Sequence, residues 1–168
     1  MKNAECVSFV AVLTYTWLQI MLFGGLVAET LLVYPNVFAD IPRSFEATME
    51  FMQVTDPGLL FPPFGAATIL VGLIALVLVW RTRAVRYLLA SSLAAFGLGN
   101  ALFSVLFAWP RNVIMFEEGA QVHSVSYLEQ IAQEFVLGHW VRLVASLITA
   151  ILAGAGFLTL SRRRLTAG

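Results

Sequence analysis

The sequence is poor in charge and contains a single cysteine. Only 12% of its 168 residues are charged, whereas 60% are hydrophobic, and the mean hydropathy is +0.84. A water-soluble domain carries about 25% charged residues. This chain has too few to cover its surface with polar groups, so the medium around it must be lipid. A net charge of zero gives no reason to expect nucleic acid as a partner. Cys6 stands alone, which excludes an internal disulfide.

Motifs for the common soluble chemistries are also missing. The chain has no nucleotide-binding loop, no hydrolase nucleophile elbow, no CxxC pair and no zinc-protease motif. Its length suits one domain, residues 1–168. What the chain does have is long apolar runs.

Four of these runs are long enough to cross a hydrocarbon core of about 30 Å as helices, which takes about 20 residues. They cover residues 9–33, 59–80, 85–109 and 135–160. Four strands could not close a barrel, so the sequence predicts an all-α fold, a four-helix transmembrane bundle.

A cleaved signal peptide is the competing interpretation of the first run, because residues 37–39 loosely resemble a cleavage site. A signal core spans only about 7–15 apolar residues, however, and this run is longer. We therefore expect the first run to stay in the membrane.

The charges are distributed unequally between the two sides of such a bundle. Seven basic residues fall on one side: Lys2, Arg81, Arg83, Arg86, Arg162, Arg163 and Arg164. The two longer loops on the other side, 34–58 and 110–134, hold eight of the ten acids. The positive-inside rule then places both termini in the cytoplasm of a plasma or bacterial inner membrane.

Short helical segments are expected in both outer loops. Phe45, Met49 and Met52 recur at helical spacing, which predicts an amphipathic helix on the bundle or in the interface. Ser126 followed by Glu129 fits a capping box, so we expect the fourth helix to begin near Tyr127 and to project above the membrane.

Three ionisable residues of the spans share one depth. Glu29 lies about one turn below the outer end of the first span, while His139 and Arg142 lie within the first two turns of the fourth. His139 and Arg142 are three positions apart and so share a helix face. Glu29 and Arg142 could simply pair and lock two helices together. Alternatively, the three groups are catalytic and line a pocket, where Arg142 orients an oxygen and Glu29 or His139 moves a proton.

Other polar and aromatic residues give further candidates. Asn100 could join helices or contact a substrate. A metal site would use His139 and Glu29 with His123 from the outer loop, although no metal-binding spacing supports it. Cofactor use is therefore open between none and a metal or haem near His139.

Several short motifs resemble the anthrone oxygenase-like family of small four-helix integral membrane proteins. They are Gly24-Gly25 with Glu29 and Pro35, residues 49–53 before Asp56-Pro57, Trp109-Pro110-Arg111-Asn112, and His139-Trp140-Val141-Arg142-Leu143. The resemblance implies a four-helix bundle that oxidises an aromatic, anthrone-type molecule with dioxygen. It makes Asn112, His139 and Arg142 the carried-over polar residues, and we predict Asn112, Asn100, Trp109 and Trp140 as substrate contacts.

Three functions compete at this point. The first is an oxidoreductase of oxygenase type that takes a lipophilic aromatic molecule from the bilayer at an outer-leaflet polar pocket, with or without a metal or haem. The second is an accessory subunit or ligand-binding protein whose small-residue faces pack on a second copy or on a partner membrane subunit. The third is a small proton-coupled transporter, against which the long loops and Arg142 argue.

Overall fold

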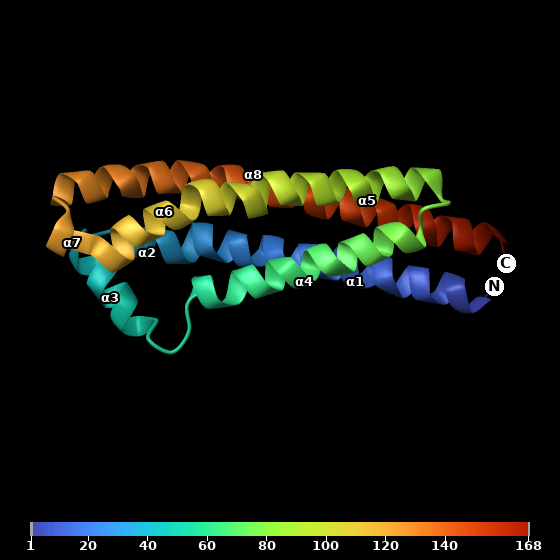
Figure 1. Ribbon diagram of the computed structural model, residues 1–168, viewed down its shortest axis with the longest axis horizontal. Coiled ribbons are helices and arrows are strands. Elements are labelled where there is room, and N and C mark those ends of the chain that lie inside the picture. The colour runs from blue at the N-terminus through green and yellow to red at the C-terminus, as the bar shows by residue number, and fades with distance from the viewer. Residues whose placement is uncertain (1, 168) are drawn as a thin grey trace.

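The computed structural model describes residues 2–167, and within this range it contains helices and no strand. Four helical rods lie side by side as an elongated bundle (Figure 1). Each is long and apolar enough to cross a membrane: Glu5–Val37, Pro57–Leu78, Arg83–Val122 and Val125–Thr166. The predicted all-α bundle with four spans is confirmed, and these spans indicate an integral membrane protein.

The rods form a ring. The long helices are α1 (Lys2–Ala28), α4 (Pro57–Leu78), α5 (Arg83–Phe96) and α8 (Val125–Ala167). Helix α1 packs on α4 and α8, and α5 packs on the same two helices. Both termini lie at one end of the bundle, together with the tight turn between α4 and α5 (Figure 1). We call this the terminal end and the opposite one the loop end; which of them is cytoplasmic stays a prediction.

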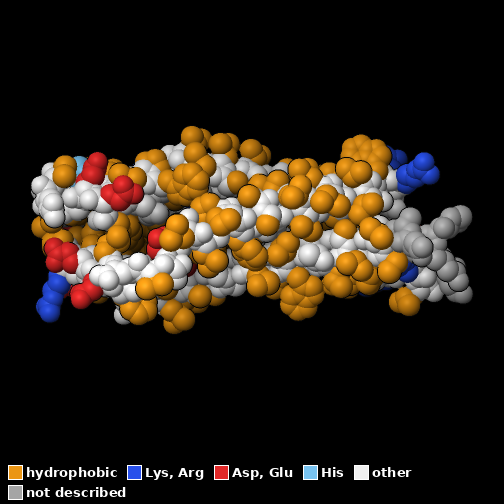
Figure 2. All heavy atoms as spheres, turned by 60° about the horizontal axis from the view of Figure 1, so that its bottom comes forward, with side chains coloured by type: hydrophobic (Ala, Val, Ile, Leu, Met, Phe, Trp, Pro, Cys, Tyr) orange, Lys and Arg blue, Asp and Glu red, His pale blue; other side chains and the backbone are white. Residues whose placement is uncertain are grey.

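The loop end carries the shorter helices. They are α2 (Tyr34–Val37), α3 (Arg43–Phe51), α6 (Trp109–Asn112) and α7 (Gly119–Val122). Helix α3 confirms the predicted amphipathic segment, and it buries Phe45 against the rings of Phe38 and Phe116. Charged side chains gather near the two ends of the visible face, while apolar side chains cover the middle, as a bilayer requires (Figure 2).

The terminal half of the bundle has a close-packed core. Its buried members are Val12, Tyr15, Ala75, Val79, Val85, Leu89, Ala153 and Leu160. Polar groups in this core are bonded to one another: the hydroxyls of Tyr15 and Ser92 lie 2.9 Å apart, and Ser92 donates to the carbonyl of Thr149 at 2.9 Å. Gly72 lets α4 approach closely, because a Cβ there would lie 2.6 Å from the Tyr15 ring and 2.7 Å from Leu93.

The third rod is longer than the sequence suggested. Residues 110–134 were expected to form a loop, but the chain stays helical as far as Val122, and α8 begins at Val125. The predicted capping box at Ser126 is wrong, since the Tyr127 N–H bonds to Oγ of Ser124 at 3.4 Å. The helix bends at Gly119, whose φ of 55° favours glycine, and the chain reverses in the residues between α7 and α8.

Within the described residues, four π-helical segments interrupt the rods. They are η1 (Glu29–Val33), η2 (Gly97–Leu102), η3 (Ser104–Ala108) and η4 (Val113–Glu118). Three of them lie toward the loop end, and η2 lies near the middle of the third rod. Segments η1 and η3 end just before Tyr34-Pro35 and Trp109-Pro110. Proline lacks an N–H and its ring clashes with the carbonyl four residues earlier, and a wider turn relieves that clash. Accordingly, the Tyr34 N–H bonds to the carbonyl of Glu29, and the Trp109 N–H to that of Ser104.

Candidate functional site

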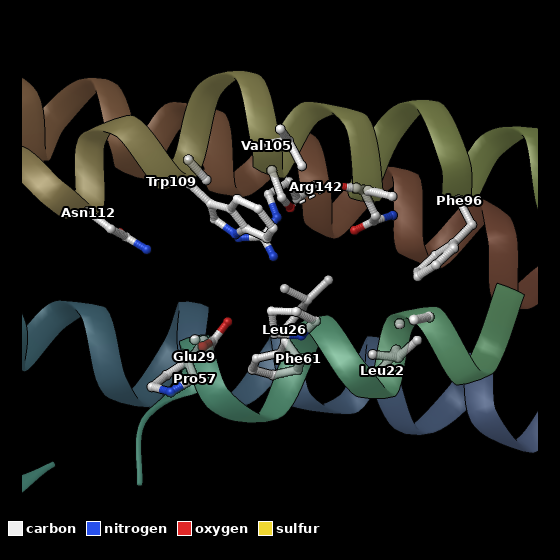
Figure 3. A pocket seen from close by; sticks show the side chains of 18 of the residues that line it. Leu22, Leu26, Glu29, Pro57, Phe61, Phe96, Val105, Trp109, Asn112 and Arg142 are labelled. Atoms are coloured by element: carbon white, nitrogen blue, oxygen red, sulfur yellow. Dashed lines mark hydrogen bonds between the residues drawn. The ribbon is translucent and has the colours of Figure 1, made fainter. Parts of the chain in front are cut away.

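A cavity of about 270 Å³ lies within the loop half of the bundle. Its walls come from α1 and η1, from α4, from the η2 to α6 part of the third rod, and from α8 (Figure 3). Helix α4 packs on α5 and α1, whereas the cavity separates its first turns from η2 and η3. Most lining side chains are apolar, and the main polar ones are Glu29, Tyr34, Asn100, Ser104, Asn112 and Arg142.

Glu29 is a buried carboxylate that borders this cavity. It is the first residue of η1 and is 6% exposed. Among the described residues it has no side-chain hydrogen bond, and its nearest basic group is Nε2 of His139, 3.9 Å from Oε2. Burying a carboxylate without hydrogen bonds costs free energy, so a ligand that offers a proton or a donor would find a receptive partner here.

His139 connects Glu29 to Arg142. It is 2% exposed, and its Nδ1 lies 3.4 Å from Nη1 of Arg142. A guanidinium only donates, so Nδ1 must be the acceptor, and we assign the proton of the neutral ring to Nε2, which faces Glu29. The edge of the Tyr34 ring, 4.6 Å from His139 between centroids, fixes the imidazole from one side. His139 therefore has no free lone pair with which to act as a base.

Arg142 also faces the cavity, and its Nε has no hydrogen-bond partner. The ion pairs within 4 Å in the described part of the chain are Arg111–Glu134, His123–Glu118 and His139–Glu29. Arg142 and Glu29 thus do not touch, in contrast to the interhelical lock considered from the sequence. Both charges remain directed at the space that a ligand would occupy (Figure 3).

Two asparagines extend the polar lining along the bundle. Asn100, 5% exposed and within η2, leaves its Nδ2 without a partner, and Asn112, at the end of α6, leaves its Oδ1 without one. No interhelical hydrogen bond of Asn100 is found between described residues, so the structure gives it no joining role. The two residues are twelve positions apart (112 − 100), or roughly 18 Å along a helix. The cavity is therefore elongated, with a donor near one end and an acceptor near the other.

The remaining predicted residues divide between the cavity and the surface. Trp109 lines the cavity beside Asn112 (Figure 3). Trp140 is 46% exposed and lies outside the cavity lining. His123 directly follows α7 and bonds to Glu118 at the end of η4. His139 lies fourteen residues inside α8 (139 − 125), roughly 21 Å along its axis, so the two histidines do not form one site.

The metal and haem hypotheses fit these residues poorly. The described residues contain no group of three or more His, Cys, Asp or Glu side chains placed to hold a metal ion. Nδ1 of His139 is taken by Arg142, and a cation bound there would meet the guanidinium charge. Nε2 faces Glu29 at 3.9 Å, and the rings of Tyr34 and Phe135 lie 4.6 Å and 6.1 Å from the imidazole between centroids, so a haem on Nε2 would have to displace these groups.

Sequence reasoning missed Tyr34, Phe61, Phe96 and Ser104 as lining residues. A signal existed for Tyr34, because a proline within an apolar helix widens the preceding turn and such π-turns are frequent at functional sites. The same signal precedes Trp109. The two phenylalanines carry no such mark, since any apolar residue of a span can face lipid or cavity.

No protein-family model, curated protein or solved structure matches the chain. The resemblance to the anthrone oxygenase-like family therefore stays a hypothesis that rests on short sequence motifs.

Proposed function

We propose that the protein is a membrane-embedded oxygenase that deprotonates a lipophilic aromatic molecule in the cavity and lets dioxygen oxidise it. The observation that carries this proposal is the pair of opposite charges, Glu29 and Arg142, that border one apolar cavity without bonding each other. A base beside a fixed cation suits the removal of a proton from carbon, because the cation stabilises the negative charge that develops.

Three residues, Glu29, Arg142 and His139, each have a distinct task in this proposal. The Glu29 carboxylate takes the proton from the acidic C–H of the substrate. The Arg142 guanidinium holds the oxygen of the substrate, which becomes an enolate. His139 is a positioning residue: its Nδ1 orients Arg142 and its Nε2–H faces Glu29. General bases of this kind contribute typically 10²–10⁴-fold to a rate.

The oxidation that follows balances with dioxygen as the only oxidant. For an anthrone-type ring, the carbanion passes two electrons to dioxygen, one at a time, and a C–O bond forms. The resulting peroxide takes up the proton that Glu29 holds. Glu29 then removes the second proton from the same carbon, the O–O bond breaks, and hydroxide leaves as water once protonated. One oxygen atom ends in the quinone and the other in water.

The apolar wall supports a substrate that dissolves in the bilayer. Phe61, Phe96 and Trp109 present aromatic rings to the cavity, and such rings prefer to stack on or meet the edge of another aromatic system. Exclusion of water also strengthens the electrostatic effect of Arg142 on a buried enolate.

The proposal is tested by oxygen uptake with anthrone as the probe. The protein in nanodiscs is compared with its Glu29→Gln variant, and Glu5→Gln serves as the matched control because Glu5 is exposed at the terminal end. We expect Glu29→Gln to slow anthrone oxidation about 10²–10⁴-fold, Glu5→Gln to leave it unchanged, and label from ¹⁸O₂ to enter the quinone.

Two results would overturn it. A Glu29→Gln variant that oxidises anthrone at the unaltered rate would remove the base from the mechanism. A parent protein that binds anthrone tightly and consumes no oxygen would be a binding protein, the second of the functions considered from the sequence.

A further inference from the structure

A second hollow lies at the loop end, beneath α3. This groove measures about 510 Å³ and is bounded by Thr48, Met49 and Met52 on one side and by Val113 and Phe116 on the other. Six residues line both the groove and the cavity: Tyr34, Pro57, Gly58, Pro62, Trp109 and Asn112. Because they share these walls, the two hollows adjoin each other.

The opposite direction is closed. Between the cavity and the terminal end lies the core cluster, in which Val12, Val85 and Leu89 are fully buried. The hydroxyls of Tyr15 and Ser92 bond to each other inside this core and offer no open path. A molecule that reaches Glu29 from the terminal end would have to separate close-packed helices.

The mouth of the groove combines adaptable walls with exposed apolar side chains. Helix α3 is held between non-helical links at residues 38–42 and 52–56, and the flexible thioethers of Met49 and Met52 can adjust to different apolar shapes. Beside them Phe51 is 86% and Val54 92% exposed. Such exposed apolar side chains suit contact with the lipid of the bilayer surface.

We propose that this groove is the access route to the site: a lipophilic molecule leaves the bilayer at the loop end, passes under α3 and reaches Glu29 at the junction marked by Tyr34, Trp109 and Asn112. The inference rests on the proposed function only in taking the cavity as a ligand site. The inference adds the direction of entry to the proposed function: substrate enters and product leaves at the loop end, opposite the termini. Under the predicted topology that end is the outer face of the membrane.

The test uses a reagent that needs no catalysis. In a Cys6→Ser background, Ala101→Cys places one thiol in the cavity wall, and N-ethylmaleimide measures how fast a small neutral molecule reaches it. Met49→Trp fills the groove from α3, while Glu50→Trp puts the same bulk on the neighbouring residue, which is exposed and outside the groove lining. Thermal unfolding of each variant verifies that the fold is retained.

We expect Met49→Trp to slow alkylation at least tenfold and Glu50→Trp to leave it unchanged. Equal rates in all three proteins would overturn the route in favour of lateral access between α4 and the third rod. A parent thiol that does not react would overturn it as well, because an open route must admit so small a molecule. Since alkylation requires no turnover, failure of the route and failure of the oxygenase proposal are seen in separate assays.

Discussion

The two halves of the bundle are built differently although the same rods run through both. In the terminal half the long helices are regular, the core is closed, and the hydroxyls of Tyr15 and Ser92 are bonded. In the loop half, π-helical segments interrupt the first and third rods around an elongated cavity. Within the described residues, six buried polar residues have unpartnered atoms, and four of them line this cavity or contact Glu29: Asn100, Asn112, His139 and Arg142.

This contrast teaches where stability and function reside. Close packing and the hydrogen bonds among Tyr15, Ser92 and Thr149 stabilise the terminal half. Unpartnered polar atoms and a cavity cost free energy, and a protein keeps such features where a ligand completes them. Substitutions in the two halves should therefore affect different measurements, and three pairs of variants test this.

The largest effect, on the rate of anthrone oxidation, is expected for Arg142→Leu in the loop half. Loss of the oxyanion partner should slow anthrone oxidation about 10²–10³-fold, whereas the melting temperature should stay the same or rise because an unpaired charge is removed from the bundle. Arg111→Leu is the matched control, since Arg111 pairs with Glu134 at 2.7 Å and lies outside the cavity lining. It should leave the rate unchanged. Slower oxidation in the control and not in Arg142→Leu would break the comparison.

The next largest effect is expected for Gly72→Ala in the terminal half, which should lower the stability of the protein rather than its rate of anthrone oxidation. The added Cβ would lie 2.6 Å from the buried Tyr15 ring, and such overpacking costs typically 1–3 kcal/mol of unfolding free energy. Gly154→Ala is the control, because a Cβ there meets no atom within 4 Å; it should stabilise α8 by up to about 1 kcal/mol. Thermal and denaturant unfolding in detergent measure both. Equal stability of the two variants would show that the terminal core is loosely packed.

The smallest effect on the measured property is expected for Pro110→Ala in α6, two residues after the end of η3. The new N–H can bond to the carbonyl four residues earlier, so the turn should relax from π- to α-helical geometry. Trp109 and Asn112 would then shift relative to the cavity, and affinity for anthrone should fall a few-fold while stability rises slightly. Quenching of tryptophan fluorescence measures the affinity, with Pro63→Ala, an exposed proline inside α4, as control. Unchanged affinity for anthrone in Pro110→Ala would show that the π-helical turn does not contribute to binding.

Parts of the site could be predicted because helices are regular. Counting residues from the ends of the spans placed Glu29, His139 and Arg142 at one depth. In the structure His139 lies between the other two, 3.9 Å from Glu29 and 3.4 Å from Arg142. Periodicity likewise predicted α3. Depth along a helix follows from its fixed rise, so it needs no tertiary information.

Other parts could not be predicted because they depend on rotation and packing. Whether Glu29 pairs with Arg142 or both face a cavity is decided by how α1 and α8 turn about their axes. Trp140 lies one residue after His139, yet one is 46% exposed and the other 2%. The helix beyond Trp109 was missed because Pro110 is typical of a helix end, whereas in the structure the wider turn of η3 precedes this proline and the helix continues through it.

The sequence by itself determined that this protein has four apolar helices, an amphipathic segment at one end and three ionisable groups at one level, because hydrophobicity and helical rise act along the chain. Only the tertiary structure decided that Glu29 and Arg142 border a cavity, that a groove under α3 lies next to this cavity, and that the core of the terminal half is close-packed. The reason is physical: a cavity is space that side chains from several helices leave unfilled, and no single stretch of sequence records how its neighbours pack.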